Sequence, residues 1–419
     1  MKLTSVFAGA VSGIVVGYYA PWGQVQPRAL PYNKITHLNY AFGSLHTHAT
    51  PAKITFDDAV DGLKLREVTQ RAHANQAKVL ISLGGWTGSQ TFSTVVRNAT
   101  LRAEFIHNAM RFVGKEYGLD GIDIDWEYPG RQGIRCNVVD GNDSQNYLML
   151  LKELRAALDV AFPTQHKLIT GAVRTSPFDG ADGRPMQDVS AFAKYFDFIN
   201  IMSYDMFTSA SPTTGPNAPF RQSTSHDAMS FTKAIDEWID AGFPAQQLTS
   251  GVPFYGHSYI ATTDMSKHPT NQYAPHTKVT PKGDRSDDLF TSPICNEGTS
   301  FSGIYKYKYL RQDILVANPL TPSNGYVRYW DNTTLTPWLF NRKTNKFIAY
   351  DDPTSLAIKV HFAKCRNLLG MMIWDLSSDF NTELLDIVNT SHHTCAPHHP
   401  STHRTPRFVL KISASRKKL

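Results

Sequence analysis

The sequence has no apolar stretch long enough to span a lipid bilayer, no glycine-rich phosphate-binding loop and few cysteines. The first absence excludes a transmembrane helix, so we expect no membrane partner, and the second removes the usual signal for a nucleotide cofactor. The cysteines lie too far apart for a zinc knuckle, and in an oxidising compartment they form up to two disulfides whose pairing the sequence leaves open. They are Cys136, Cys295, Cys365 and Cys395.

The body of the chain also lacks an excess of basic residues. The formal charge is +6, but six basic residues and no acidic ones follow Pro400. The remainder holds 36 basic and 36 acidic residues. Nucleic-acid binding needs a basic face on the folded body, so we expect no nucleic-acid partner.

What the sequence does contain is enough apolar material for a large core. The chain has 419 residues, of which 41% are hydrophobic and 11% aromatic. This composition fits one large globular domain, or one domain with an insertion. We expect a monomer.

Both ends of the chain differ from its body. Residues 1–13 resemble a short secretory signal with a small-residue cleavage site, although an ordinary disordered terminus is the alternative. Residues 392–419 are rich in His and basic residues and predict a disordered tail. Four sequons support a secreted, extracellular glycoprotein. They begin at Asn98, Asn142, Asn332 and Asn389.

Short apolar runs alternate with amphipathic helical patterns. Thr100 is a good helix N-cap residue, and Ser144–Leu158 is a second helical stretch. Eight such runs predict a (β/α)8 barrel, with an open doubly wound sheet as the alternative. The runs are Ile14–Tyr19, Ile35–Phe42, Lys78–Leu83, Gly121–Trp126, Leu168–Val173, Phe198–Met202, Leu248–Val252 and Gly370–Trp374.

The interval between the last two runs is much longer than the others and is rich in Tyr and short alternating segments. We therefore predict a small α+β insertion domain between the seventh and eighth strands, over residues 257–345. Residues 14–256 and 346–391 then form the barrel.

The fourth run lies within the sequence DGIDIDWE, residues 120–127. Alternate residues of a strand face the same side, so Asp123, Asp125 and Glu127 face the barrel interior and rise toward its C-terminal mouth. Three carboxyl groups on one inward face repel each other and lose hydration. This arrangement costs stability, so a stable barrel does not require it. A calcium site or a structural acid cluster is the alternative, but calcium usually takes its carboxylates from a flexible loop. The pattern favours catalysis.

Several motifs together resemble the family 18 glycoside hydrolases, the chitinases and their relatives. The resemblance runs from about Ile14 to Asp379 and includes the insertion. It rests on Asp120, Asp123, Asp125 and Glu127 (D-x-x-D-x-D-x-E), on Ser82-Leu83-Gly84-Gly85, on Met202-Ser203-Tyr204-Asp205, on Gly251–Gly256 and on Met372-Ile373-Trp374.

The resemblance implies retaining, substrate-assisted hydrolysis of chitin or an N-acetylglucosamine oligosaccharide, without metal or cofactor. Glu127 is then acid and base, Asp125 serves the acetamido group, Asp123 shares a proton with Asp125, and Tyr204 holds the acetamido carbonyl. The implied substrate-binding residues are Tyr18, Trp86, Met202, Asp205, Tyr255 and Trp374.

Other features leave alternatives open. A non-catalytic chitin-binding lectin on the same fold, or an endo-β-N-acetylglucosaminidase acting on N-glycans, fits part of the pattern. His257 stands where many relatives carry Arg, and no Trp follows Asp205, so the leaving-group side differs from the family. We expect Asp120 to brace the strand entry and Phe42 to be core.

Overall fold

The computed structural model describes residues 13–45, 48–223, 229–291, 295, 298–390 and 395. The predicted signal segment, apart from Gly13, and the predicted tail, apart from Cys395, lie outside the described residues. No helix in the described part of the chain is long and apolar enough to cross a bilayer.

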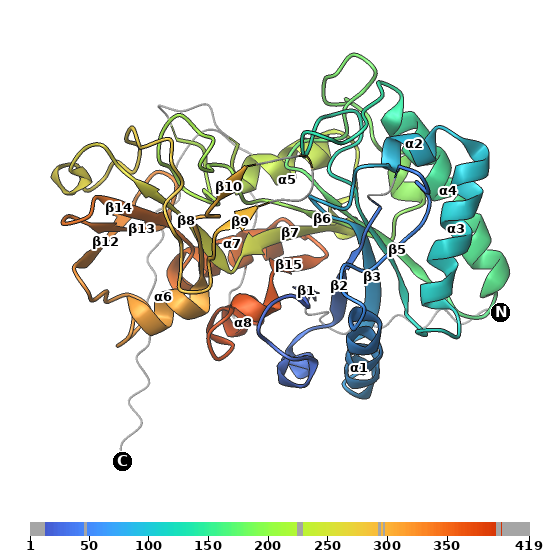
Figure 1. The fold of residues 1–419 in the computed structure, drawn as a ribbon, viewed down its shortest axis with the longest axis horizontal. Helices are drawn as coiled ribbons and strands as arrows, with labels where there is room; N and C mark the ends of the chain where they lie inside the picture. Colours follow the sequence, from blue (N-terminus) through green and yellow to red (C-terminus); the bar gives the residue numbers. More distant parts are fainter. Residues whose placement is uncertain are drawn as a thin grey trace.

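Eight parallel strands close into a barrel in the order β1-β15-β7-β6-β5-β4-β3-β2 (Figure 1). They coincide with the eight predicted runs apart from small displacements of their ends, so the closed barrel is confirmed and the open sheet is excluded. The strands are β1 (Ile14–Tyr19), β2 (His37–Gly43), β3 (Lys78–Gly84), β4 (Gly121–Asp125), β5 (Leu168–Val173), β6 (Phe198–Ile201), β7 (Leu248–Pro253) and β15 (Gly370–Trp374).

Helices cover the outside of the barrel. The helix predicted from Thr100 begins instead at Ala99, because the Asn98 side chain accepts hydrogen bonds from the backbone N–H groups of Thr100 and Leu101. The helices of the barrel are α1 (Asp61–Ala74), α2 (Phe92–Val96), α3 (Ala99–Val113), α4 (Asp143–Ala161), α5 (Phe231–Asp240), α7 (Pro353–Cys365) and α8 (Glu383–Val388). Short 3₁₀ turns lie at Pro27–Ala29, Tyr32–Lys34, Phe192–Lys194, Ala245–Gln247, Met265–Lys267 and Leu376–Ser378.

The insertion between β7 and β15 forms an antiparallel sheet of order β11-β8-β14-β13-β12, which projects to one side of the barrel (Figure 1). It is wider than the predicted range 257–345, because β8 starts at Tyr255 and pairs with β14, which ends at Ala349. Its elements are β8 (Tyr255–Ile260), β9 (Phe290–Thr291), β10 (Thr299–Ser300), β11 (Ile304–Lys306), α6 (Tyr307–Asp313), β12 (Tyr326–Asp331), β13 (Thr336–Asn341) and β14 (Lys346–Ala349).

Strand alternation separates two packing layers around the barrel wall. Ile122 and Ile124 of β4, and Trp126 directly after it, belong to the large core under the helices. The barrel interior has a smaller apolar cluster that includes Tyr18 and Met372. The Asp123 and Asp125 side chains therefore lie inside the barrel, as the alternation predicts.

Candidate active site

A cavity of about 340 Å³ opens at the C-terminal ends of the barrel strands, where barrel enzymes carry their chemistry. All of the predicted site residues line it except Asp123, which lies beneath. Its lining consists of Tyr18, Trp22, Phe42, Asp57, Trp86, Thr87, Asp125, Glu127, Ala172, Met202, Tyr204, Asp205, Tyr255 and Trp374.

Asp123 is fully buried and accepts four hydrogen bonds. Its Oδ2 accepts from the hydroxyls of Tyr18 (2.8 Å) and Ser82 (2.7 Å). Its Oδ1 accepts from the Thr170 hydroxyl (2.5 Å) and the Asn200 amide (3.4 Å). Burial raises the pKa of Asp123, but these donors oppose that rise by stabilising the charged form. Thr170 escaped sequence reasoning, although the strand register places it directly beside Asp123.

Asp125 is also buried, but no hydrogen-bond donors in the described part of the chain oppose the rise of its pKa. Burial raises its pKa well above the ordinary value, and the charges of Glu127 and Asp123 add to the effect. Its Oδ1 is buried without a hydrogen-bond partner among the described residues. The described residues show no hydrogen bond between Asp125 and Asp123, so the sharing of a proton between them stays a prediction.

Glu127 follows the end of β4 and is 9% exposed. Burial raises its pKa to about 7; the negative charge of Asp205 adds to this, and the Tyr128 hydroxyl opposes it. A carboxyl group with this pKa exists in both protonation states near neutral pH, as a group that donates and later accepts a proton requires.

Two glycines allow β3 to approach the carboxylate strand. Gly84 has φ +112°, and a Cβ atom there would lie 2.2 Å from the Asp125 carbonyl oxygen. The Gly85 N–H donates to the same oxygen at 2.8 Å. This close approach is the physical basis of the S-x-G-G pattern.

Aromatic rings form the apolar floor of the cavity. Trp374 is the last residue of β15, and the Phe42 ring stacks on it at 5.7 Å with an interplanar angle of 18°. The Tyr18 ring lies 5.5 Å from Trp374 on another side. Phe42, which we expected to be core, therefore belongs to the cavity wall, because it lies at the C-terminal end of β2 near the mouth.

Tyr204 and Asp205 follow β6 and face the cavity from the opposite side. The Tyr204 hydroxyl contacts only a weak acceptor, Met372 Sδ at 4.0 Å, among the described residues, so it can donate to a ligand. Asp205 Oδ1 accepts from the Tyr255 hydroxyl (2.6 Å) and contacts His257 Nε2 (2.7 Å). His257 thus contacts Asp205 directly, with an imidazole where many relatives carry a guanidinium.

The cavity lining also contains residues that sequence reasoning missed. Trp22 is 63% exposed and follows β1, while Trp86, which we had predicted, is 48% exposed. Asp57, Thr87 and Ala172 were also missed. The signal available for Trp22 was its position shortly after the end of β1, whereas Asp57 lies far beyond the end of β2, close to the start of α1, and carried no such signal.

Asp120 lies away from the cavity. Its Oδ2 accepts from the Val79 N–H and contacts His73 Nε2, both at 2.8 Å. This contact ties the entry of β4 to β3 and α1. In the part of the chain that the structure describes, no three His, Cys, Asp or Glu side chains are grouped as a metal site requires.

Comparisons with known proteins agree with this architecture. The sequence model of "Glycosyl hydrolases family 18" matches residues 14–379. A "chitinase-like effector" of Moniliophthora roreri is 34% identical, over 91% of this chain and 93% of that protein. Chitinase A1 of Niallia circulans is 29% identical, over 88% of this chain and 57% of that protein. A crystal structure of a Rhizomucor miehei chitinase superimposes with a TM-score of 0.81 at 33% identity, covering 90% of this chain and 99% of that one. The chain therefore belongs to glycosyl hydrolase family 18.

Proposed function

We propose that the protein hydrolyses β-1,4-glycosidic bonds in chitin or chitooligosaccharides, with retention of configuration and with the substrate's own acetamido group as nucleophile. The observation that carries the proposal is the shared cavity of Glu127, Asp125 and Tyr204. It brings together a carboxyl group of pKa about 7, a carboxyl oxygen without a partner among the described residues and a hydroxyl with only a weak acceptor.

Glu127 is protonated when the substrate binds. It gives its proton to the leaving glycosidic oxygen as the bond to the anomeric carbon breaks, and the 2-acetamido oxygen forms a new bond to that carbon. The cyclic oxazolinium ion is then opened by water. Glu127, now ionised, takes a proton from this water and returns to its starting state.

The other polar groups serve the acetamido group. Asp125 accepts a hydrogen bond from its N–H, which orients its oxygen and offsets the positive charge of the intermediate. Tyr204 donates to the acetamido carbonyl oxygen. Asp123 shares a proton with Asp125. The proton rests on Asp125 in the free protein, because Asp123 with its four donors is better suited to hold a negative charge, and it passes to Asp123 when Asp125 faces the positive intermediate.

The rings of Trp374, Phe42 and Tyr18 suit the apolar face of the sugar at the cleavage point. Trp22 and Trp86, exposed at the rim, suit sugars further along the chain. The names of the relatives support a chitin-like substrate, and this scheme uses no cofactor.

The test is hydrolysis of a fluorogenic chitotrioside by the wild type, by Glu127→Gln and by Glu104→Gln. Glu104 is an exposed residue of α3 and provides a matched control. We expect Glu127→Gln to lower kcat by roughly three orders of magnitude or more, because both proton transfers lose their group. The control should match the wild type. Equal rates for all three proteins would contradict the mechanism.

One alternative has support from the relatives, since two of them, 34% and 32% identical, are called chitinase-like effectors. If the folded wild type bound chitotetraose without cleaving it, chitin sequestration would replace hydrolysis as the function. Cleavage of a glycopeptide with a chitobiose core, but not of chitotriose, would favour the N-glycan endoglycosidase.

The role of the acetamido group as nucleophile has its own test. A substrate without its N-acetyl group should not be cleaved.

We propose that the protein works outside the cell. In the structure Cys136 pairs with Cys295 and Cys365 with Cys395, and such bonds persist in oxidising compartments. All four sequon asparagines are exposed. This location is tested by looking for the protein in the culture medium of the cells that make it, and by treating it with a glycosidase to detect attached glycans.

A further inference from the structure

Two side chains hold the backbone of Glu127 at both ends. The Glu127 N–H donates to the Ser89 hydroxyl at 3.1 Å, and the Glu127 carbonyl oxygen accepts from the Asn137 amide at 2.7 Å. Both partners are buried. Ser89 Oγ also lies 3.1 Å from the Asp125 carbonyl oxygen. The conformation of the Glu127 peptide is therefore set by residues outside β4.

The loop that supplies Asn137 is folded closely around this carbonyl group. A Cβ atom at Gly133 would lie 1.9 Å from the Glu127 oxygen, so no other residue fits there without displacing the backbone. Gln132 Nε2 donates to the carbonyl oxygens of Ile134 and Asn137, at 2.7 and 3.3 Å. The loop is thus held from within as well as against Glu127.

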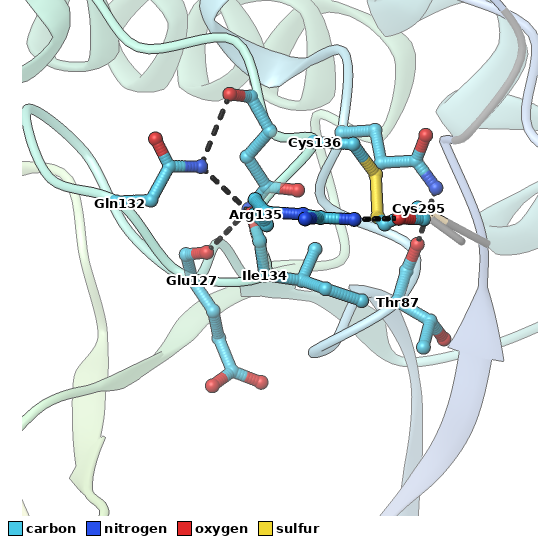
Figure 2. Close-up of a disulfide and its surroundings, with 9 residues drawn as sticks. Thr87, Glu127, Gln132, Ile134, Arg135, Cys136 and Cys295 are labelled. Atoms are coloured by element: carbon cyan, nitrogen blue, oxygen red, sulfur yellow. Dashed lines mark hydrogen bonds between the residues drawn. A yellow bond between two sulfur atoms is a disulfide. The ribbon is translucent and has the colours of Figure 1, made fainter. Parts of the chain in front are cut away.

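The residue before Asn137 is covalently attached to the insertion domain. Cys136 forms a disulfide with Cys295, 159 residues away, between β9 and β10 (Figure 2). The Arg135 guanidinium also donates to the Cys295 carbonyl oxygen at 2.6 Å. Figure 2 shows Arg135 and the Cys136–Cys295 disulfide side by side, with Thr87 and Glu127 in the same surroundings. The second disulfide, Cys365–Cys395, instead joins the end of α7 to the chain beyond α8.

From this arrangement we propose that the insertion domain positions the Glu127 carboxyl group through the Cys136–Cys295 disulfide and Asn137. Asn137 and the disulfide are positioning elements, since they act through the Glu127 backbone and not on the substrate. The proposal rests on the proposed function only in taking Glu127 as the proton donor.

Loosening the loop changes both the geometry and the hydration of Glu127. A small displacement of a proton donor slows the chemical step far more than it weakens binding, so kcat falls while KM changes little. Water that reaches Glu127 reduces the desolvation that raises its pKa, and the pKa moves downward. The other groups that face Glu127, namely Asp125, Tyr128, Tyr204 and Asp205, are unchanged in such a variant.

The experiment compares Asn137→Ala and the double variant Cys136→Ser/Cys295→Ser with the wild type. The double variant Cys365→Ser/Cys395→Ser is the matched control, because it removes a disulfide at the end of α7, which contributes none of the described contacts of Glu127. Asn137→Ala leaves both disulfides in place, so a folding failure of the double variant does not end the test. Fluorogenic chitotrioside hydrolysis gives kcat and KM, and a carbon-13 NMR titration of Glu127 gives its pKa.

We expect roughly a tenfold to hundredfold loss of kcat in Asn137→Ala and in the Cys136/Cys295 variant, with KM within about threefold of the wild type. In both, the pKa of Glu127 should fall below its wild-type value. The control pair should keep the wild-type kcat and pKa.

Unchanged kcat and unchanged Glu127 pKa in Asn137→Ala would overturn the inference, as would equal losses in the two cysteine variants. If the wild type proved inactive, the proposed function would fail, but the titration would still decide whether the loop controls the Glu127 carboxyl group.

Discussion

The floor of the cavity, with its aromatic rings and the carboxyl groups beside them, comes from the ends of barrel strands, whereas the rim is exposed and comes from loops. Asp123 and Asp125 on the floor belong to β4, and Glu127 follows it directly. On the rim, Trp22 follows β1 and Asp57 lies close to the start of α1, and both are exposed. Low hydration on the floor strengthens every electrostatic interaction there, while water weakens those at the rim. The same side chain therefore has a very different weight in the two regions.

Matched removal of a carboxylate from each region gives the largest expected contrast. Asp125→Asn keeps the side-chain volume but removes the acid that orients the acetamido group, so kcat should fall by about 100-fold to 1000-fold. Asp57→Asn makes the same change at the rim, and we expect less than about a threefold effect on kcat. Steady-state hydrolysis of a chitotrioside measures both. Similar losses in the two variants would refute the division of the cavity into floor and rim.

The pH dependence of the wild type sharpens the same contrast. The pKa of Glu127 is raised to about 7 by burial, and the protonated form is the active acid. The value of kcat/KM should therefore fall as pH rises through about 7, approaching a tenfold loss per pH unit. A pH profile from 5 to 9 measures this limb.

Substitution of Asp205 tests whether this fall in kcat/KM reports Glu127, because the charge of Asp205 adds to the rise of the Glu127 pKa. Asp57→Asn is the control. In Asp205→Asn the limb should move to lower pH, whereas in Asp57→Asn it should stay in place. A flat profile between pH 6 and 9 in the wild type is incompatible with Glu127 as the acid.

The same division explains what could be predicted from the sequence. Strand alternation has a fixed period, so DGIDIDWE placed Asp123 and Asp125 inside the barrel, and order along the chain predicted eight strands. Loop residues follow no such period, and for that reason Trp22 and Asp57 were missed. Phe42 was assigned to the core because the residue type alone does not tell whether a strand end opens on a cavity.

Other features could not be predicted because they depend on local backbone geometry or on contacts between distant parts of the chain. Thr100 and Asn98 are both good N-cap residues, and only the backbone geometry showed that Asn98 accepts the two hydrogen bonds. The pairing of Cys136 with Cys295 depends on an insertion domain folding back over the β4 loop, which no local pattern records. Asn137, the buried partner of the Glu127 carbonyl group, depends on the same loop.

The smallest expected effect concerns Trp22. Its indole stacks on Phe42 at 5.9 Å and leaves one side open to water, so it suits a sugar beyond the cleavage point. Trp22→Ala should raise KM by roughly threefold to tenfold for a long chitooligosaccharide, since such a contact contributes about 1 kcal/mol. The value of kcat should stay within about twofold, because Trp22 does not touch the carboxyl groups. Shortening the substrate separates rim from floor: a chain too short to reach Trp22 should lose the KM effect, while the Asp125→Asn defect should persist at every length. A large fall in kcat for the shortest substrate would instead place Trp22 in the floor.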